Sequence, residues 1–208
     1  MRNPRSMLRT RRVWSSALTA ITLAIGAVVP GNATAAADPC AARSTKTAFS
    51  AWGDYNDYFL VNNGDFESGI RNWSVINRVY SIWDNEPWRV NGWFDRKSAR
   101  LEPESTLTSV TFCVAEREDF LRFFVRHPPV SGAKLVVEIS VSDGTRTLEK
   151  TYELASQWWQ GWAPSEPMGF PNVRNAQGEQ LVTISFRATG SRANWSIDDV
   201  MVDPFKSK

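Results

Sequence analysis

The stretch VNNGDFESGIRNWSV, residues 61–75, places a tight turn next to closely spaced carboxylates. The Asn-Gly pair at 63–64 is a turn signal, because both residues tolerate a positive φ. On an extended chain Asp65 and Glu67 point to one side while Phe66 points to the other. One apolar side chain and two carboxylates beside a turn are typical either of the entrance to a strand or of one half of an ion site.

The rest of the chain shows the alternation of short β-strands. In the clearest hairpin, residues 134–154, apolar residues alternate along the first strand and Ser-Asp-Gly-Thr supplies the turn. Residues 107–114, 119–126 and 180–188 alternate in the same way, and no stretch keeps a sustained helical period. Short strands separated by turns predict a single all-β domain, an antiparallel β-sandwich.

The N-terminal segment, residues 1–37, is typical of a cleaved secretory signal peptide. Five arginines and no acidic residue precede an apolar run, which small residues follow. The run is shorter than the roughly 20 apolar residues that cross a membrane, so we expect no membrane span after cleavage. Residues 38–57 are expected to form an extended arm and residues 58–208 the sandwich domain. The mature protein is expected outside the cell.

Removal of the signal peptide reverses the sign of the net charge. The full chain carries a formal charge of +2, whereas the residues after Ala37 include 19 basic and 22 acidic side chains, a charge of −3. The basic balance of the precursor is therefore no reason to expect nucleic acid as a partner.

The chain contains only two cysteines, Cys40 and Cys113. In an exported protein such a pair most often forms a disulfide. This bond would tie the arm to an interior strand and close a long loop, which contributes about 4 kcal/mol in the chain-entropy model.

The C-terminal segment WSIDDVMVD, residues 195–203, forms a recognisable pattern together with the opening stretch. NGDFESG followed by a tryptophan, together with WSIDDV, resembles the two ends of the jelly-roll carbohydrate-binding-module and galactose-binding-like superfamily. The resemblance covers residues 60–204 and implies that the first and last strands lie side by side. The layout with the Cys40 arm and the terminal VDPF is also similar to a group of small secreted actinobacterial proteins of unassigned function.

The resemblance further implies a structural calcium ion, since carboxylates and carbonyls from the two ends commonly cage one in that superfamily. Calcium takes six to eight oxygen ligands. The expected ligands are Glu67 and Asp199, with Asp198 as the alternate because neighbouring strand residues face opposite ways. Asp65 is a fourth candidate, although the family pattern leaves its position free. In the alternative, an aspartate caps a strand, Glu67 faces water and no ion binds.

Nine tryptophans follow the signal peptide, and most of them gather in two segments rich in Gly, Pro, Asn and Gln. Sugar rings stack on indole through their C–H faces, while their hydroxyl groups bind polar side chains. We therefore expect these segments to bind a carbohydrate or another polar ligand. The candidate residues are Trp83, Trp88, Trp93, Trp159 and Trp162. The alternative for each is plain packing at the open ends of the sandwich.

Catalysis is not expected. His127 is the only histidine, and no G-x-S-x-G elbow accompanies it. Paired carboxylates are the stronger case for an enzyme, because glycoside hydrolysis needs two of them at a fixed separation. The candidates are Asp84, Glu86, Asp95, Glu116, Glu118 and Asp119. Acidic residues are, however, common on any protein surface.

The sequence therefore predicts a secreted, non-catalytic module that binds carbohydrate or another polar extracellular ligand. The alternative is a secreted structural or interaction protein of the cell envelope, which uses the same sandwich without a small ligand and binds an extracellular protein. A glycan-active enzyme is the third hypothesis.

Overall fold

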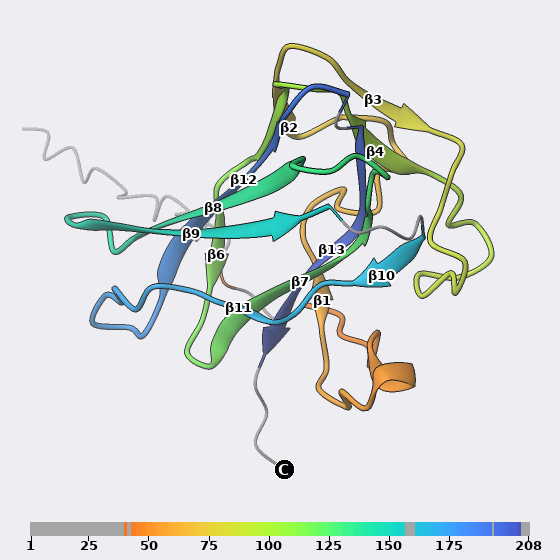
Figure 1. The fold of residues 1–208 in the computed structure, drawn as a ribbon. Helices are drawn as coiled ribbons and strands as arrows, with labels where there is room; N and C mark the ends of the chain where they lie inside the picture. Colours follow the sequence, from red (N-terminus) through yellow and green to blue (C-terminus); the bar gives the residue numbers. More distant parts are fainter. Residues whose placement is uncertain (1–39, 41–42, 157–160, 193, 205–208) are drawn as a thin grey trace, which may run out of the picture. The chain divides into compact units, whose positions relative to one another are not determined.

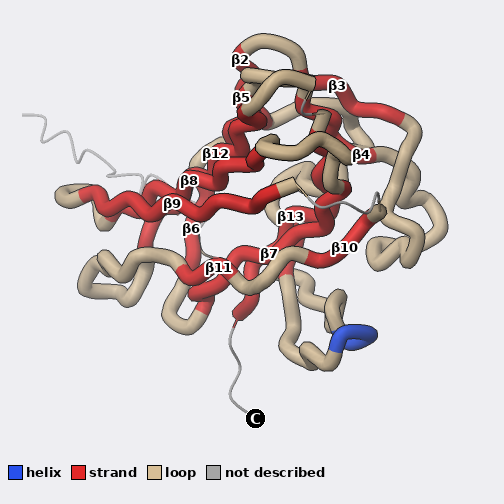
Figure 2. The backbone as a smooth tube through the Cα atoms, in the orientation of Figure 1, coloured by secondary structure: helices blue, strands red, loops and turns tan. Residues whose placement is uncertain are grey.

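The computed structural model describes residue 40 and residues 43–156, 161–192 and 194–204. The predicted signal peptide lies outside the described residues. Two antiparallel sheets pack against each other in the unit formed by residues 37–208 (Figure 1). Within the described residues the one helical element is a 3-10 turn at Ser50–Trp52 (Figure 2). The predicted fold class, an all-β jelly-roll sandwich, is confirmed.

The first sheet has seven strands. Its main path runs through β10 (Trp162–Pro164), β7 (Glu118–Arg126), β13 (Trp195–Pro204), β4 (Ser98–Leu101) and β3 (Val79–Ile82), while β1 (Phe59–Leu60) pairs with β13 and β11 (Met168–Gly169) pairs with β7. Because β13 is the last strand and lies between β7 and β4, the C-terminal end of the domain runs through the middle of this sheet (Figure 1).

The second sheet has six strands. Its path runs through β2 (Trp73–Ile76), β5 (Thr106–Ser109), β12 (Gln180–Thr189), β8 (Lys134–Ser142) and β9 (Thr147–Ala155), and β6 (Phe112–Val114) pairs with β12. The predicted hairpin is β8 and β9. Its turn is fixed by the Asp143 carboxylate, which accepts the backbone N–H groups of Thr145 and Arg146.

The core lies between the sheets, and the strand residues that face it alternate along each strand as the sequence pattern predicts. On β12, Val182, Ile184 and Phe186 are fully buried; on β7, Leu121 and Phe123 are. Polar or partly exposed residues stand between them on β12. The two-residue period therefore places the apolar side chains between the sheets.

The arm packs against the face of the first sheet that points away from this core. Phe49 and Tyr58 form a separate buried cluster with Phe124 of β7 and Met201 of β13. The rings of Phe49 and Phe124 stack with their centroids 5.1 Å apart. The residues after the disulfide thus form a packed layer, not only an extended tether.

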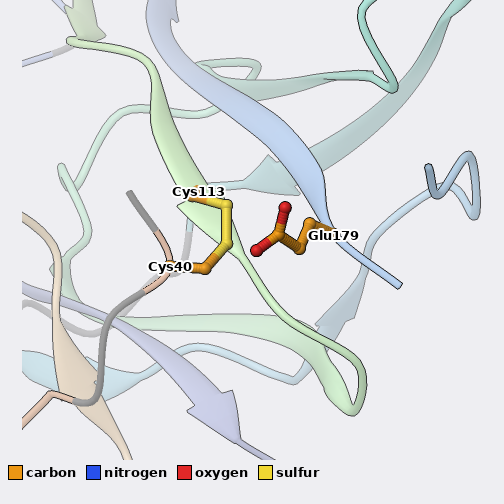
Figure 3. A group of neighbouring side chains, drawn as sticks. All are labelled: Cys40, Cys113 and Glu179. Atoms are coloured by element: carbon orange, nitrogen blue, oxygen red, sulfur yellow. A yellow bond between two sulfur atoms is a disulfide. The ribbon is translucent and has the colours of Figure 1, made fainter. Parts of the chain in front are cut away.

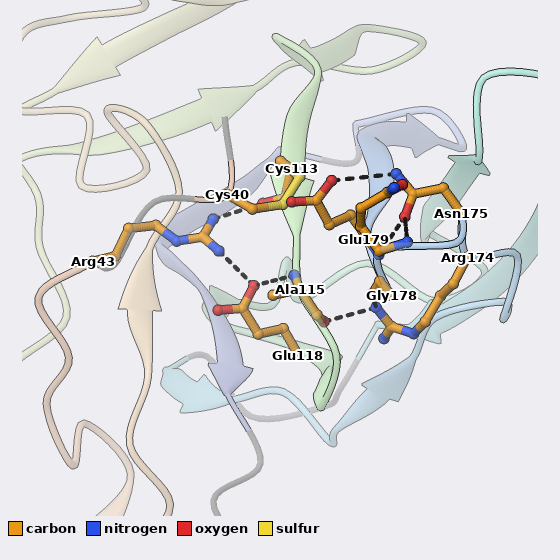
Figure 4. The surroundings of a disulfide bond; sticks show 10 residues. Cys40, Arg43, Cys113, Ala115, Glu118, Arg174, Asn175, Gly178 and Glu179 are labelled. Carbon is orange, nitrogen blue, oxygen red and sulfur yellow. Dashed lines mark hydrogen bonds and ion pairs between the residues drawn. A yellow bond between two sulfur atoms is a disulfide. The ribbon is translucent and has the colours of Figure 1, made fainter. Parts of the chain in front are cut away.

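The predicted disulfide between Cys40 and Cys113 is confirmed, with Cα atoms 5.0 Å apart. Glu179 lies beside the bond (Figure 3), but both sulfurs are bonded to each other and neither is a free thiolate ligand. The arm is held further by Arg43, which donates to the Cys113 carbonyl at 2.6 Å and to the Glu118 carboxylate at 2.5 Å (Figure 4).

Candidate functional site

The opening stretch and the last strand meet, as the resemblance implies. Phe59 and Leu60 of β1 pair with β13. The pairing continues beyond β1, because the Val61 N–H donates to the Val200 carbonyl at 2.9 Å and the Val200 N–H donates to the Gly64 carbonyl at 3.1 Å. The turn that follows β1 therefore rests directly on β13.

A bulge interrupts β13 at this contact. The pairing with β7 shifts register between Asp198 and Met201, and Asp199 has a φ of 49°. Both Asp198 and Asp199 are fully buried as a result. In a regular strand, side chains alternate between the two faces, so we expected only one of the two aspartates to face inward. The bulge interrupts this alternation.

Three buried carboxylates gather beside the bulge. One oxygen from each of Glu86, Asp95 and Asp199 lies within 4.8 Å of the others. The Asn91 amide donates to Asp199 Oδ1, and the Lys46 ammonium group donates to the Asn91 side-chain oxygen. Asp199 Oδ2 and Asp95 Oδ1 are buried with no hydrogen-bond partner in the described part of the chain. Hard cations bind such oxygens.

Burial raises the pKa values of three acids at this bulge, Asp95, Asp198 and Asp199. It raises the pKa of Asp95 to about 6, and the charge of Glu86 acts in the same direction. The pKa values of Asp198 and Asp199 lie well above the usual range, first because of burial and then because of acidic neighbours. The Lys46 charge acts in the opposite direction on Asp199. The site therefore favours any partner that neutralises its negative charge.

Glu86 also organises the loop that carries it, residues 83–97 between β3 and β4. Its two carboxylate oxygens accept the backbone N–H groups of Val90 at 2.6 Å and Trp88 at 2.5 Å. The Glu86 N–H in turn approaches Asp198 Oδ2 at 3.5 Å. The loop is thus folded around a buried carboxylate and joined to β13.

Glu67 and Asp65 flank this cluster from the turn after β1. Glu67 Oε1 accepts the backbone N–H groups of Arg96 at 2.5 Å and Lys97 at 2.6 Å, so it holds the far end of the same loop. Asp65 contributes its charge to the raised pKa of Asp199. Neither belongs to the group of three convergent carboxylates within the described residues.

Glu86 and Asp95 are the residues that the sequence interpretation did not assign to the ion site. Both stood among the candidate glycosidase carboxylates, far from the motifs at the two chain ends. The sequence feature that could have identified them as site residues is their position in a loop with three tryptophans. The sequence does not show that this loop folds back onto β13.

The predicted aromatic residues on this loop are exposed. Trp83 is 74% exposed, Trp93 80% and Trp88 44%. The Lys97 ammonium group lies 5.0 Å from the Trp83 ring and the Arg89 guanidinium group 5.7 Å from the Trp93 ring. Trp88 also packs edge-on against Trp52, with centroids 4.7 Å apart, and so combines packing with exposure.

A surface cavity of about 630 Å³ lies along the loop, lined by Pro87, Trp88, Arg89, Gly92 and Trp93. Trp162 is half-buried on β10, outside this cavity, and Trp159 lies outside the described residues. Trp73 and Trp195, which are not among the candidates, are buried in the main core.

Three of the other carboxylates proposed for hydrolysis are held in ion pairs. Glu118 is bound to Arg43, Asp119 to Arg174 and Asp84 to Arg126. His127 packs against the Trp195 ring, with centroids 5.2 Å apart, and its Nδ1 lies 3.2 Å from the Ala155 carbonyl oxygen. Burial lowers the pKa of His127.

Solved structures with a similar fold include carbohydrate-binding modules. The chain aligns with a domain of the bacteriophage CBA120 tailspike protein 4 at a TM-score of 0.51 and 14% identity, over 69% of this chain and 21% of that one. A family 61 module solved with β-1,4-galactotriose gives 0.47 and 18%, over 69% and 96%. A family 16 module gives 0.46 and 12%, over 69% and 98%.

At these identities the similarity concerns the fold alone, and the predicted sandwich fold agrees with it. No family model and no curated protein matches the chain. Among the described residues, none of the helical structure is long and apolar enough to cross a membrane.

Proposed function

We propose that the protein is a secreted, non-catalytic module that binds carbohydrate through the loop of residues 83–97. One observation carries the proposal: the loop exposes Trp83 and Trp93 while its acids Glu86 and Asp95 are buried. Exposed indoles beside Arg and Asn side chains suit sugar rings, which need an apolar face and polar contacts at the rim. The buried acids give the same loop a rigid base.

A calcium ion fits the base of this loop. The donors are carboxylate oxygens of Glu86, Asp95 and Asp199, two of which contribute an oxygen without a hydrogen-bond partner in the described residues. Asp198 and Glu67 would support these ligands from β13 and from the turn after β1. When bound, calcium supplies positive charge that relieves the repulsion between the acids. When no calcium is bound, the Lys46 ammonium group offsets part of the negative charge of the acids.

The exposed loop can hold its shape because it is bonded both within itself and to the rest of the domain. Glu86 accepts two backbone N–H groups of the loop itself, the Asn91 amide donates to Asp199 of β13, and Glu67 accepts two backbone N–H groups near the end of the loop. A binding surface that is already ordered loses less entropy when it binds a ligand. This arrangement supports a binding site on the loop.

The test is a glycan array probed with the mature protein, followed by fluorescence titration of each positive glycan. Stacking should quench tryptophan emission, and Trp93→Ala should weaken binding by about two- to tenfold, since a stacked ring contributes about 0.5–1.5 kcal/mol beyond its buried area. Tyr55→Ala is the matched control, because Tyr55 is exposed at 66% but lies outside the loop. Absence of binding to any glycan would reject the proposal and favour an envelope protein that uses these aromatic residues against a protein partner.

A further inference from the structure

A row of polar and aromatic residues crosses the first sheet on the face away from the core. Cα pairing joins neighbouring strands through Tyr80, Arg100, Ser196, Arg126 and Trp162 on β3, β4, β13, β7 and β10 in turn (Figure 1). Residues directly opposite each other on neighbouring strands share one face of a sheet. The residues beside them in sequence, Ala99, Ile197 and Val125, belong to the main core. The row therefore faces outward.

A cavity of about 320 Å³ opens over the middle of this row. Its walls include Arg100, Arg126 and Ser196 from the strands, together with Asp84 and Arg192 from the adjoining loops. The lining therefore contains three arginines and one acidic residue. Burial lowers the pKa of the neighbouring His127, so this imidazole adds no positive charge at neutral pH.

The cations in this cavity are incompletely paired. Arg126 donates to the Asp84 carboxylate at 2.5 Å. The side chains of Arg100 and Arg192 are exposed and make no hydrogen bond or ion pair with any described residue. A mature chain with a net charge of −3 thus presents two uncompensated arginines in one hollow. Such a hollow attracts an anion.

The chemistry of the hollow favours carboxylates attached to sugar rings. The planar fork of a guanidinium group matches a carboxylate with two parallel hydrogen bonds, and the Arg126–Asp84 pair already brings these two groups together here. Arg100 and Arg126 lie on strands that flank β13, so their backbones are about 10 Å apart. A polysaccharide with one carboxylate on each of several sugar rings suits this spacing better than a single, multiply charged anion. Tyr80, which is exposed, and Trp162, which is half-buried, stand at the two ends of the row.

We propose that this hollow binds the carboxylate groups of a uronic-acid polysaccharide through Arg100, Arg126 and Arg192, with Ser196 as a central hydroxyl contact. The inference rests on the proposed carbohydrate-binding function and names its ligand class. Trp83 immediately precedes Asp84 at the rim of the hollow, so one glycan chain can reach both the exposed loop and the sheet face.

The experiment measures binding of the mature protein to polygalacturonate, alginate and hyaluronan by affinity electrophoresis. Each polymer is compared with its methyl ester, which removes the charge and adds one methyl group per carboxyl. At least one acid polymer should bind about tenfold or more tightly than its ester, and added salt should weaken that binding. Arg100→Gln combined with Arg192→Gln should remove this preference. Arg71→Gln, an exposed arginine outside the hollow, should leave it unchanged.

The inference is overturned if every acid polymer binds as tightly as its ester. It is also overturned if the preference for the acid polymer survives the double substitution. Stronger arginine-dependent binding of a sulfated polymer than of any uronic-acid polymer overturns the assignment to carboxylates. Neutral glycans that still bind through Trp93 in either case leave the proposed function in place. If no glycan on the array binds, the proposed carbohydrate-binding function itself is rejected. The experiments therefore distinguish failure of the uronic-acid inference from failure of the proposed function.

Discussion

Gly64 and Val200 join the two ends of the domain at a contact with no room for a side chain. The Val200 N–H donates to the Gly64 carbonyl at 3.1 Å, and a Cβ atom on Gly64 would lie 2.8 Å from the Val200 carbonyl oxygen and 3.0 Å from that of Val61. The glycine of the opening motif is therefore required by close approach of the backbone, and its φ is not in the left-handed region.

Replacement of this glycine should destabilise the domain. In Gly64→Ala the new methyl group must displace the backbone of β13, and we expect a loss of about 1–3 kcal/mol in the free energy of unfolding, as in overpacked cores. Urea unfolding measures the change. Gly169→Ala is the control, because a Cβ atom there would meet no backbone atom and would lie 3.4 Å from the Phe120 ring and 3.8 Å from the Tyr152 hydroxyl, which are ordinary contact distances. Equal stability of the two variants would contradict the steric account.

The disulfide should contribute most of the stability of the arm. It joins residues 73 positions apart, and loss of such a crosslink costs about 4 kcal/mol in the chain-entropy model. We expect Cys40→Ala combined with Cys113→Ala to lower the unfolding midpoint in urea, and a reducing agent to lower that of the natural protein but not of the variant. Mass spectrometry of the unreduced protein checks the bond. Two free thiols in the unreduced protein would refute the pairing.

The stability of the protein should depend on pH through Asp203. Burial raises the pKa of Asp203 to about 7, and the charge of Asp54 acts in the same direction, while the Asn56 amide and the charge of Arg122 oppose it. The folded state therefore keeps a proton that the unfolded chain releases near pH 4. Stability should then fall as pH rises from about 4 to 7, by at most about 4 kcal/mol.

Asp203→Asn should reduce this fall in stability, which urea unfolding at pH 4.5 and 7.5 in the presence of a chelator would measure. Asp143→Asn is the control. Two backbone N–H groups lower the pKa of Asp143 to about 2, so its contribution is present above pH 4 and is lost only at lower pH. This control should leave the difference between pH 4.5 and 7.5 unchanged. An Asp203 variant with the same pH dependence as the natural protein would show that the buried acid is not its source.

The fold could be predicted from sequence because its signals are local. Alternation marks β8, β9 and β12, and the turn residues mark the hairpin. The meeting of β1 with β13 could be predicted only from the resemblance to known jelly rolls. The register that aligns Arg100, Ser196 and Arg126 joins residues distant in the chain, and no pattern in the sequence reports it.

The ion site could be predicted only in part. Asp198 and Asp199 stand in the recognised C-terminal motif, but strand alternation allowed only one of them inside. The bulge at Asp199, with a φ of 49°, buries both. Glu86 and Asp95 come from an irregular loop, whose path depends on tertiary hydrogen bonds such as that between the Glu86 N–H and Asp198.

The most direct test of the central claim, that a cation supports the glycan-binding loop from beneath, is the melting temperature of the mature protein in chelator and in millimolar calcium. At a hundredfold excess over Kd the ion adds about 2.7 kcal/mol, which should raise the melting temperature by several degrees. In Asp199→Asn the rise should vanish while the chelated protein stays folded, because the substitution removes a buried charge. Asp84→Asn, at an acid outside the cluster, should keep the rise. A melting temperature indifferent to calcium, in protein shown by elemental analysis to be metal-free, would contradict the claim.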